Sequence, residues 1–219
     1  PPFGGTEEDG IENNFPANLR TRETADLFMA LIVKLLKDNG RAAVVLPDGF
    51  LFGEGTKTRL KIDLLTQCHL HTVIRLPNGV FNPYTGIKTN VLFFTKKPES
   101  EHPATKEVWF YEHPYPEGVV NYNKTKPMRF EEFQSEIDWW GKEEDGFESR
   151  VETEQAWKVS FEDLFSRDFN LDISNPHVGE KISHDPNELL AEYNDQQNQI
   201  QSIRDELKTI LQEALSGGE

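Results

Sequence analysis

The chain has 219 residues, of which 36 % are hydrophobic, and a formal net charge of −15. This length allows one domain with extensions or two small domains, and 15 Phe and 4 Trp supply apolar surface for a core. No stretch approaches the ~20 apolar residues of a membrane span, and the single Cys68 excludes an internal disulfide, which fits a reducing cytoplasm.

The negative charge is concentrated in the second half of the chain. Residues 1–115 carry a balance of −1, whereas residues 116–219 carry −14. A surface that contacts DNA neutralises phosphates with Lys and Arg. Any nucleic-acid role therefore belongs to the first half or requires a partner.

Helix and strand patterns alternate in the first half. Apolar residues recur at helical spacing over 22–39, where Asn39-Gly40 suits a left-handed stop, and a shorter helix is predicted over 56–67. The unbroken apolar run 42–46 predicts a strand that is covered on both faces. Further strands are predicted over 70–76 and 90–95, and an edge strand over 108–111. This order predicts an α/β fold, the second half of a Rossmann-like, doubly wound sheet.

Three loops follow strand ends in this arrangement. They are the turn Pro1-Pro2-Phe3, the loop 47–50 and the loop 77–79. Sheets of this type bind ligands beyond the carboxyl ends of their strands. We therefore expect the three loops to share one rim of the sheet.

Residues 116–183 form an acidic and less regular extension. A short helix is predicted over 128–140, and Ser160 with Asp163 marks a helix start. The acidic run 143–154 is typical of a solvated loop. Three tryptophans, Trp139, Trp140 and Trp157, are interpreted as packing residues.

Residues 184–219 predict a terminal amphipathic helix. Asp185, Pro186 and Glu188 give a capped start. Apolar residues then fall at three- and four-residue steps: Leu189, Tyr193, Ile200, Ile203, Leu207, Ile210 and Ala214. This spacing predicts a coiled coil or docking on a partner helix; the alternative is a helix that folds back on its own domain.

The Pro1-Pro2-Phe3 turn carries the candidate chemistry. Such a turn at a strand end is the reacting corner of amino-group DNA methyltransferases, where an Asn or Asp precedes the first proline. We expect the chain to begin one residue inside this corner, within a longer protein. Taken alone, the five residues Pro1 to Gly5 favour a proline-rich disordered terminus, because short motifs often match by chance.

A longer stretch gives a specific family resemblance. Residues 68–81 (CHLHTVIRLPNGVF) and 86–96 (GIKTNVLFFTK) resemble the modification (methyltransferase) subunit of type I restriction-modification systems, and 41–49 (RAAVVLPDG) resembles the same family. The likeness covers residues 1–97 well and Phe169-Asn170-Leu171-Asp172 more loosely. It implies an adenine-N6 DNA methyltransferase that uses S-adenosylmethionine.

The resemblance also implies site residues. Pro1, Pro2 and Phe3 match the family's catalytic motif, with Phe3 stacking on the extruded base. Phe81 and Tyr84 lie where related enzymes place a second aromatic against the base; the alternative for Phe81 is a loop anchor. The glycine-rich cofactor motif has no counterpart, because the glycines over 49–55 follow the wrong strand and indicate a turn. We therefore expect no cofactor-binding residues here and weak binding of S-adenosylmethionine at best.

Other sites are less well supported by the pattern. His69 and His71 share one side of a strand, but Cys68 is out of phase, so a metal site is not expected. Cys68 also lies away from the rim and is discounted as a nucleophile. Lys57, Arg59 and Lys61 could touch phosphate, although a solvated helical face is the commoner explanation.

Together these features predict a carboxyl-terminal fragment of a type I adenine-N6 methyltransferase subunit, itself inactive. Its expected domains are 1–115, the carboxyl-terminal half of the catalytic domain; 116–183, the extension; and 184–219, the terminal helix. The expected partners are DNA, a specificity subunit bound by the terminal helix, and a restriction subunit. The alternative is a non-catalytic assembly module that keeps a methyltransferase-like half-sheet.

Overall fold

The computed structural model describes residues 1–178 and nine helical positions beyond them, 190, 193, 197, 200, 201, 203, 204, 207 and 208. Two compact units, Pro1–His177 and Val178–Glu219, are described separately. The α-helices of the first unit are α1 (Thr24–Leu35), α2 (Asp48–Phe52), α3 (Thr56–Gln67), α4 (Gln134–Trp139) and α5 (Phe161–Ser166). Its strands are β1 (Arg41–Pro47), β2 (Cys68–Arg75), β3 (Thr89–Lys96), β4 (Glu107–Glu112) and β5 (Ala156–Ser160). Short 3-10 helices are η1 (Ile11–Asn14), η2 (Ala17–Leu19), η3 (Glu99–Glu101), η4 (Phe130–Phe133) and η5 (Glu143–Asp145).

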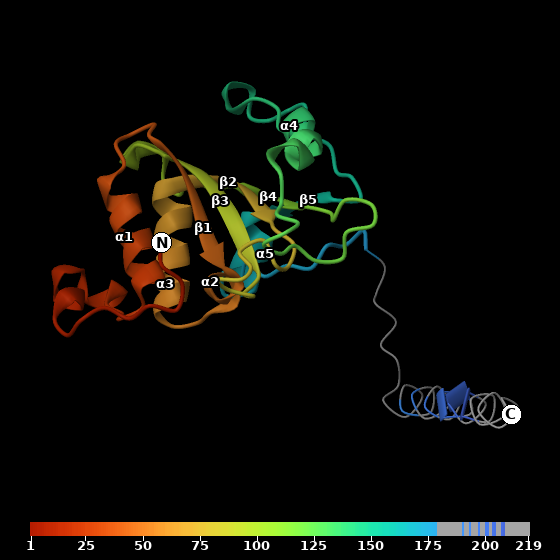
Figure 1. The fold of residues 1–219 in the computed structure, drawn as a ribbon. Coiled ribbons are helices and arrows are strands. Elements are labelled where there is room, and N and C mark those ends of the chain that lie inside the picture. Colours follow the sequence, from red (N-terminus) through yellow and green to blue (C-terminus); the bar gives the residue numbers. More distant parts are fainter. Residues whose placement is uncertain are drawn as a thin grey trace, which may run out of the picture. The chain divides into compact units, whose positions relative to one another are not determined.

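The five strands form one mixed sheet in the order β1-β3-β2-β4-β5 (Figure 1). β3 runs antiparallel to both β1 and β2, whereas β2 and β4 are parallel and β5 is antiparallel to β4. Because β3 is reversed between them, β1 and β2 point the same way. The last residues of β1, β2 and β4 therefore meet at one edge of the sheet, which we call the rim.

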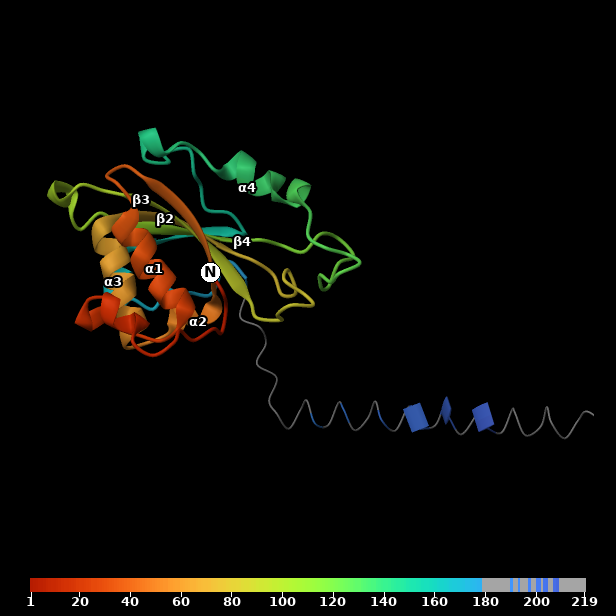
Figure 2. The same cartoon turned by 60° about the vertical axis from the view of Figure 1, so that its left-hand side comes forward.

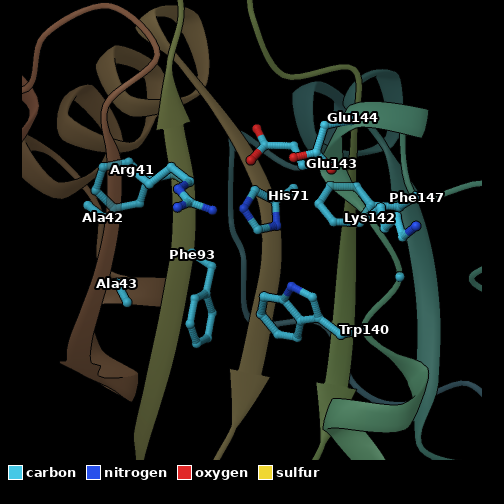
Figure 3. A pocket seen from close by; sticks show the side chains of 12 residues that line it. Arg41, Ala42, Ala43, His71, Phe93, Trp140, Lys142, Glu143, Glu144 and Phe147 are labelled. Carbon is cyan, nitrogen blue, oxygen red and sulfur yellow. The ribbon is translucent and has the colours of Figure 1, made fainter.

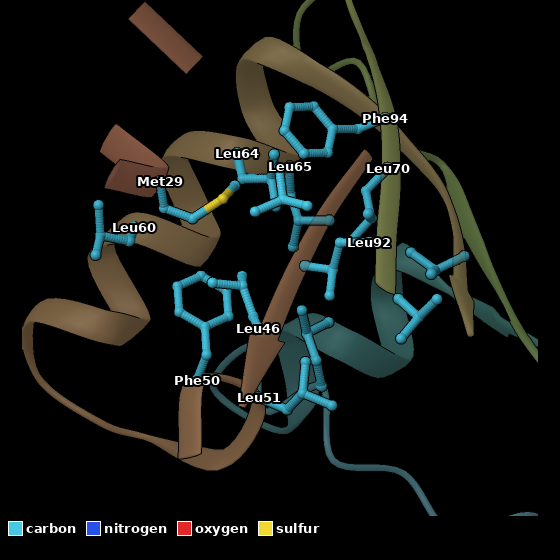
Figure 4. Packing of buried hydrophobic residues seen from close by; sticks show 14 of the residues in the cluster. Met29, Leu46, Phe50, Leu51, Leu60, Leu64, Leu65, Leu70, Leu92 and Phe94 are labelled. Atoms are coloured by element: carbon cyan, nitrogen blue, oxygen red, sulfur yellow. The ribbon is translucent and has the colours of Figure 1, made fainter. Parts of the chain in front are cut away.

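The main core lies between the sheet and helices α1, α3 and α5. Helices α1 and α3 lie side by side on this face (Figures 1 and 2). Figure 4 shows their apolar side chains against β1, β2 and β3, including Met29, Leu64, Leu46, Leu70 and Phe94, all at most 1 % exposed. Helix formation and strand burial thus stabilise each other, since each element covers apolar surface of the other.

A second cluster lies on the opposite face, beneath the segment that contains α4. Tyr111 and Ala156 are buried there, with Phe93, Trp139 and Trp140 packed against the cluster. Arg150 fastens this segment to the sheet: its Nη1 donates to the His71 carbonyl (3.2 Å) and its Nε to the Trp140 carbonyl (2.8 Å). The tryptophans that the sequence predicts to be packing residues, Trp157 included, do pack in the interior.

Several expectations about elements are confirmed. Helices, strands and the Ser160 cap occur where predicted, and the Ser160 Oγ accepts from the Asp163 backbone N–H (3.1 Å). The helix predicted over 22–39 is shorter, because α1 ends at Leu35; Asn39 does adopt a left-handed φ of 61°. The short helix predicted over 128–140 is present as η4 and α4.

Other expectations are wrong. The strand over 108–111 is not an edge, because β5, which the pattern missed, pairs with β4 on its open side. β1 is not covered on both faces within the described residues, since Ala43 is exposed. The run 143–154 is not simply solvated: Phe147 and Arg150 in it are buried, at 4 % and 5 % exposure.

The division at residue 115 stays a prediction, although the extension supplies β5 and α5 to the sheet. In the second unit, the described apolar positions Tyr193, Ile200, Ile203 and Leu207 are helical and exposed. Asp185, Pro186, Glu188, Leu189, Ile210 and Ala214 lie outside the described residues. None of the helices within the described part of the chain has the length and apolar character to cross a membrane.

Candidate base-binding site at the rim

Phe3 and Phe81 meet at the rim. Their ring centroids are 6.0 Å apart with an interplanar angle of 78°, an edge-to-face contact. Both rings are half-buried, so each keeps a surface that a ligand can touch. Two of the three aromatic residues that the sequence assigns to base stacking, 78 positions apart in the chain, are thus brought together.

The turn that carries Phe3 is fixed against the start of α1. The Thr24 backbone N–H donates to the Gly5 carbonyl (3.0 Å), and Gly4 adopts a φ of 66°, which glycine allows without strain. Pro1 is half-buried and Pro2 is exposed. The catalytic role of both prolines stays a prediction.

The loop 76–88, which we call the Phe81 loop, joins β2 to β3 at the rim. The Leu76 N–H donates to the Thr89 carbonyl (3.0 Å), which ties the two ends of the loop together. Tyr84 belongs to this loop, but its side chain is 93 % exposed. A contact between Tyr84 and a base therefore stays a prediction.

A buried charged cluster, which the pattern did not reveal, lies beneath these loops. Arg75, with its side chain 8 % exposed, pairs through Nη2 with Asp172 (2.7 Å) and donates through Nη1 to the Ile173 carbonyl (2.8 Å). Asp48 lies 3.9 Å from the same guanidinium and accepts from the Asn90 side-chain amide (2.6 Å). Because a buried charge must be paired, this cluster fixes the ends of β1, β2 and β3 against residues 172–173.

Two of the three basic residues of α3, Lys57 and Lys61, are not on a solvated face, which corrects the interpretation made for them. Lys61 is 1 % exposed and donates to the carbonyls of Leu51 (2.7 Å) and Gly53 (3.0 Å); burial lowers its pKa to about 8. Lys57 pairs with Asp26 (2.7 Å) and with Glu23. Burial alone would lower the pKa of Lys57, but its bonds to Asp26 and Glu23 raise it, and burial raises the pKa of Asp26. Arg59 is exposed, as expected of a surface position.

Cys68, His69 and His71 lie away from the rim. Cys68 is the first residue of β2 and is fully buried, which raises the pKa of its thiol to about 11. Burial lowers the pKa of His71 to about 3, so the ring is neutral at pH 7. The two histidine rings share one side of β2, with centroids 5.7 Å apart. Within residues 1–178 and the nine tail positions, no three His, Cys, Asp or Glu side chains gather as metal ligands would.

His71 lines a cavity of about 420 Å³ on the face opposite α1 and α3 (Figure 3). Phe93, Trp140 and Phe147 form its aromatic walls, and Arg41, the first residue of β1, stands at one side. The rim is at the other end of β1. This cavity is therefore separate from the Phe3–Phe81 pair.

Gly53 and Gly55 stand in the turn between α2 and α3, which agrees with the interpretation of these glycines as a turn. Gly53 ends α2, and a Cβ atom there would stand 2.1 Å from the Lys57 side chain, so the space is filled by the chain itself. Gly55, with a φ of 66°, precedes α3 as its N-cap. Gly53 and Gly55 also line a cavity of about 460 Å³, together with Arg59 and Arg167. The expectation that this chain carries no cofactor-binding residues stays a prediction.

Comparison with known proteins places this geometry in a family. The family model "N-6 DNA Methylase" matches residues 1–185. The chain is 67 % identical over 217 residues to the type I restriction enzyme EcoEI methylase subunit of Escherichia coli, covering 99 % of this chain and 43 % of that protein. It is 36 % identical over 163 residues to the EcoKI methylase subunit of Escherichia coli K12, covering 73 % and 30 %.

Solved structures agree. The modification subunit of a putative type I restriction enzyme from Vibrio vulnificus YJ016 superposes with a TM-score of 0.73 at 42 % identity, covering 84 % of this chain and 38 % of that one. The chain thus spans less than half the length of the relatives it matches. The likeness confirms the predicted half of a methyltransferase-type α/β sheet. The chain belongs to the N-6 DNA methylase family.

Proposed function

We propose that this chain is the base-facing part of an adenine-N6 DNA methyltransferase subunit of a type I restriction-modification system. The family membership supports the class of reaction. The observation that carries the proposal for the site is the meeting of Phe3 and Phe81 at the rim. Both aromatic rings are available there to an extruded base.

This reaction requires hydrogen-bond acceptors from the protein and no nucleophilic side chain, because the adenine nitrogen is itself the nucleophile. Adenine N6 reacts poorly because its lone pair is delocalised into the ring, so acceptors that hold the two amino hydrogens orient the nitrogen for attack. The Pro1 carbonyl would be one such acceptor, and the turn offers no competing proline N–H. The side chain expected before Pro1 would be the other.

S-adenosylmethionine is the cofactor we propose for the full-length subunit, where it supplies an electrophilic methyl group when bound. The residues of this chain hold the other side of the reaction. Phe3 and Phe81 would stack on the base after it leaves the duplex, because the amino group is out of reach inside the helix. Pro2 would keep the turn rigid.

The proposed partners follow from charge and from the relatives. With a balance of −14 beyond residue 115, the second half of the chain is unsuited to binding phosphates. We propose that a specificity subunit reads the DNA target and that a restriction subunit joins for cleavage. A solved structure that is 36 % identical to this chain comes from work on complex assembly of the type I restriction-modification system. We propose that the activity is cytoplasmic, where its DNA substrate would be.

The test is methyl transfer by the full-length subunit with its specificity partner. Phe3→Ala and Phe81→Ala are each expected to lower transfer to adenine-containing DNA about tenfold or more, since base–aromatic stacking contributes ~1–3 kcal/mol. Phe130→Ala, which alters a ring that is 74 % exposed on the extension, should leave transfer unchanged. Full activity in both rim variants would refute the stacking role.

The second candidate is an assembly module without catalysis. The exposed apolar positions Tyr193, Ile200, Ile203 and Leu207 of the tail favour partner binding in either case. The same assay separates the candidates, because a module of this kind assembles with the specificity subunit but transfers no methyl group.

A further inference from the structure

The Phe81 loop is contacted by the segment that follows β4 and leads into the acidic extension. Tyr115 Oη donates to the Asn78 carbonyl (2.9 Å), and the Asn82 side-chain amide donates to the Tyr122 carbonyl (3.1 Å). These two bonds grip the loop on either side of Gly79, within four residues of Phe81. We call residues 113–122 the brace.

The contact between brace and loop is close enough to require glycine. Gly79 adopts a φ of 81°, a conformation that other residues rarely take. A Cβ atom at this position would lie 2.1 Å from Asn121 Oδ1 and 2.7 Å from the Tyr122 carbonyl oxygen. The brace therefore lies directly against the loop backbone, without space for a side chain.

The brace is itself held rigidly at both ends. The His113 N–H donates to the Arg75 carbonyl (3.0 Å), and His113 Nδ1 bonds to Glu136, with both side chains at most 2 % exposed. At the other end the Tyr122 hydroxyl donates to Glu132. The two carboxylates stand four residues apart, one helical turn, where η4 continues into α4.

The Tyr122 hydroxyl must keep its proton in order to donate to Glu132. Burial of Tyr122, together with its bond to Glu132, raises the pKa of the phenol, so it remains a donor at neutral pH. The Tyr115 and Tyr122 rings also pack together, with centroids 5.4 Å apart. A loop held by fixed donors and rings keeps its geometry better than one that reaches into solvent.

We propose that the brace positions the Phe81 loop for base extrusion, and that Tyr115 and Asn82 are positioning residues for methyl transfer. This inference rests on the proposed function, in which Phe81 stacks on the base. It gives the acidic extension a part in the reaction that does not require contact with DNA. Phe81 stands in the sequence between Asn78 and Asn82, which make the two bonds, and its ring contacts that of Phe3, so a shift of the loop separates the aromatic pair.

The experiment uses the full-length subunit assembled with its specificity partner. Tyr115→Phe removes only the hydroxyl that holds Asn78, and Gly79→Ala forces loop and brace apart. Each has a matched control. Tyr111→Phe removes a hydroxyl that interacts with Ser135 of α4, not with the loop. Gly146→Ala, which lies outside the brace, places a Cβ at a similar φ of 70° with no atom within 4 Å, so it reproduces the backbone strain without the clash.

Four quantities are measured for each variant: thermal stability, hydrogen exchange of residues 77–86, fluorescence of 2-aminopurine at the target adenine, and methyl transfer. Tyr115→Phe is expected to speed exchange in the loop and to lower both base extrusion and transfer by ~3–10-fold at an unchanged Tm. Gly79→Ala should lower transfer ~100-fold, as a displacement of about 1 Å in a reacting site can. Both controls should behave like the wild type in the loop.

The results distinguish the positioning role of the brace from the proposed function on which it rests. Unchanged transfer in Tyr115→Phe, beside an impaired Phe81→Ala, overturns the brace while the proposed function stands. Full activity of Phe81→Ala overturns the proposed function and the positioning role with it. A loss of activity in Gly146→Ala equal to that in Gly79→Ala overturns the brace as well, because strain alone would then explain the effect.

Discussion

Buried charges decide much of the local geometry of this protein. Arg75, Lys61 and Lys57 each place a cation in the interior, and each is met by carbonyls or carboxylates. Desolvation makes an unpaired buried cation costly, so its partners are held wherever the chain supplies them. Arg75 joins residues 97 positions apart in the sequence, which makes it a long-range constraint on the rim.

Lys61 makes the stability of the chain depend on pH. Its pKa is about 8 when folded and about 10.5 when unfolded, so between these values the unfolded chain binds more protons. The part of the free energy of unfolding that depends on Lys61 therefore rises as pH increases from 8 to 10.5. It falls by the same amount when pH returns to 8. Relative to Lys61→Met, the wild-type free energy of unfolding should rise by about 3 kcal/mol across this range.

Denaturant unfolding at pH 7, 9 and 11 checks this. Lys37→Met, which alters an exposed lysine, is the control and should keep the wild-type rise. A Lys61→Met variant whose stability follows pH in parallel with the wild type would contradict the assignment.

The site residues show where sequence is informative and where it is silent. Phe3 and Phe81 could be predicted because each lies in a recognisable turn after a strand. Arg75, Asp48 and Asn90 could not, since a charge inside an apolar run such as Ile74-Arg75-Leu76 has no periodic signal and its partner is distant in the sequence. The burial of Lys61 was missed for the same reason. Basic residues at alternate positions of a helix suggest a solvent-exposed face, whereas here Lys61 donates to the carbonyls of Leu51 and Gly53 at the end of α2.

At the level of elements, apolar runs predicted four of the five strands. β5 was missed because Ala156-Trp157-Lys158-Val159-Ser160 is short and follows an acidic run, and its burial comes from pairing with β4. The strand order and the reversal of β3 depend on contacts between distant residues. A one-dimensional pattern does not contain those contacts.

The α4 segment is an element whose attachment depends on one residue. Arg150 donates to two carbonyls and lies over the rings of Phe147 (3.7 Å) and Trp139 (4.4 Å), and burial lowers its pKa to about 10. Arg150→Met should destabilise the chain by about 2–4 kcal/mol, because two carbonyls lose their donor and the rings of Phe147, Trp139 and Trp140 lose the cation. Equilibrium unfolding followed by tryptophan fluorescence measures the change.

A surface arginine provides the comparison for Arg150. Arg22 pairs with Asp9 in solvent, with side chains 56 % and 86 % exposed, so Arg22→Ala should change stability by less than about 0.5 kcal/mol. Equal effects of the two substitutions would show that the buried contacts of Arg150 contribute no more than a surface pair.

At the scale of the whole molecule, the two halves of the chain differ in net charge. The nearly neutral first half carries the rim, the brace spans the boundary between the halves, and the acidic second half carries the tail. The exposed tail positions Tyr193, Ile203 and Leu207 recur at helical spacing, which suits an interhelical contact. The proposed division is therefore that DNA is read by a partner and the base is handled at the rim.

Removal of residues 186–219 from the full-length subunit should abolish assembly with the specificity subunit. The physical reason is the loss of the apolar face that the tail presents. Co-purification from cells that express both subunits measures it, with the paired substitution Ile203→Ala and Leu207→Ala as the milder variant. A control that alters the polar described position Arg204 should assemble normally. Undiminished co-purification of the truncated subunit would rule out the tail as the docking element.

The reversal of β3 has a consequence for how proteins of this kind can diverge. The Phe81 loop leaves the sheet from β2 and returns in the neighbouring antiparallel β3, with its two ends tied by one backbone bond from Leu76 to Thr89. Insertions and deletions inside it leave the strand register untouched, so the loop can be exchanged between relatives as a unit. Gly79 limits the exchange, because the brace residues Asn121 and Tyr122 leave no space for a side chain at this position. Loop and brace are therefore expected to change together over evolutionary time, as one inherited module.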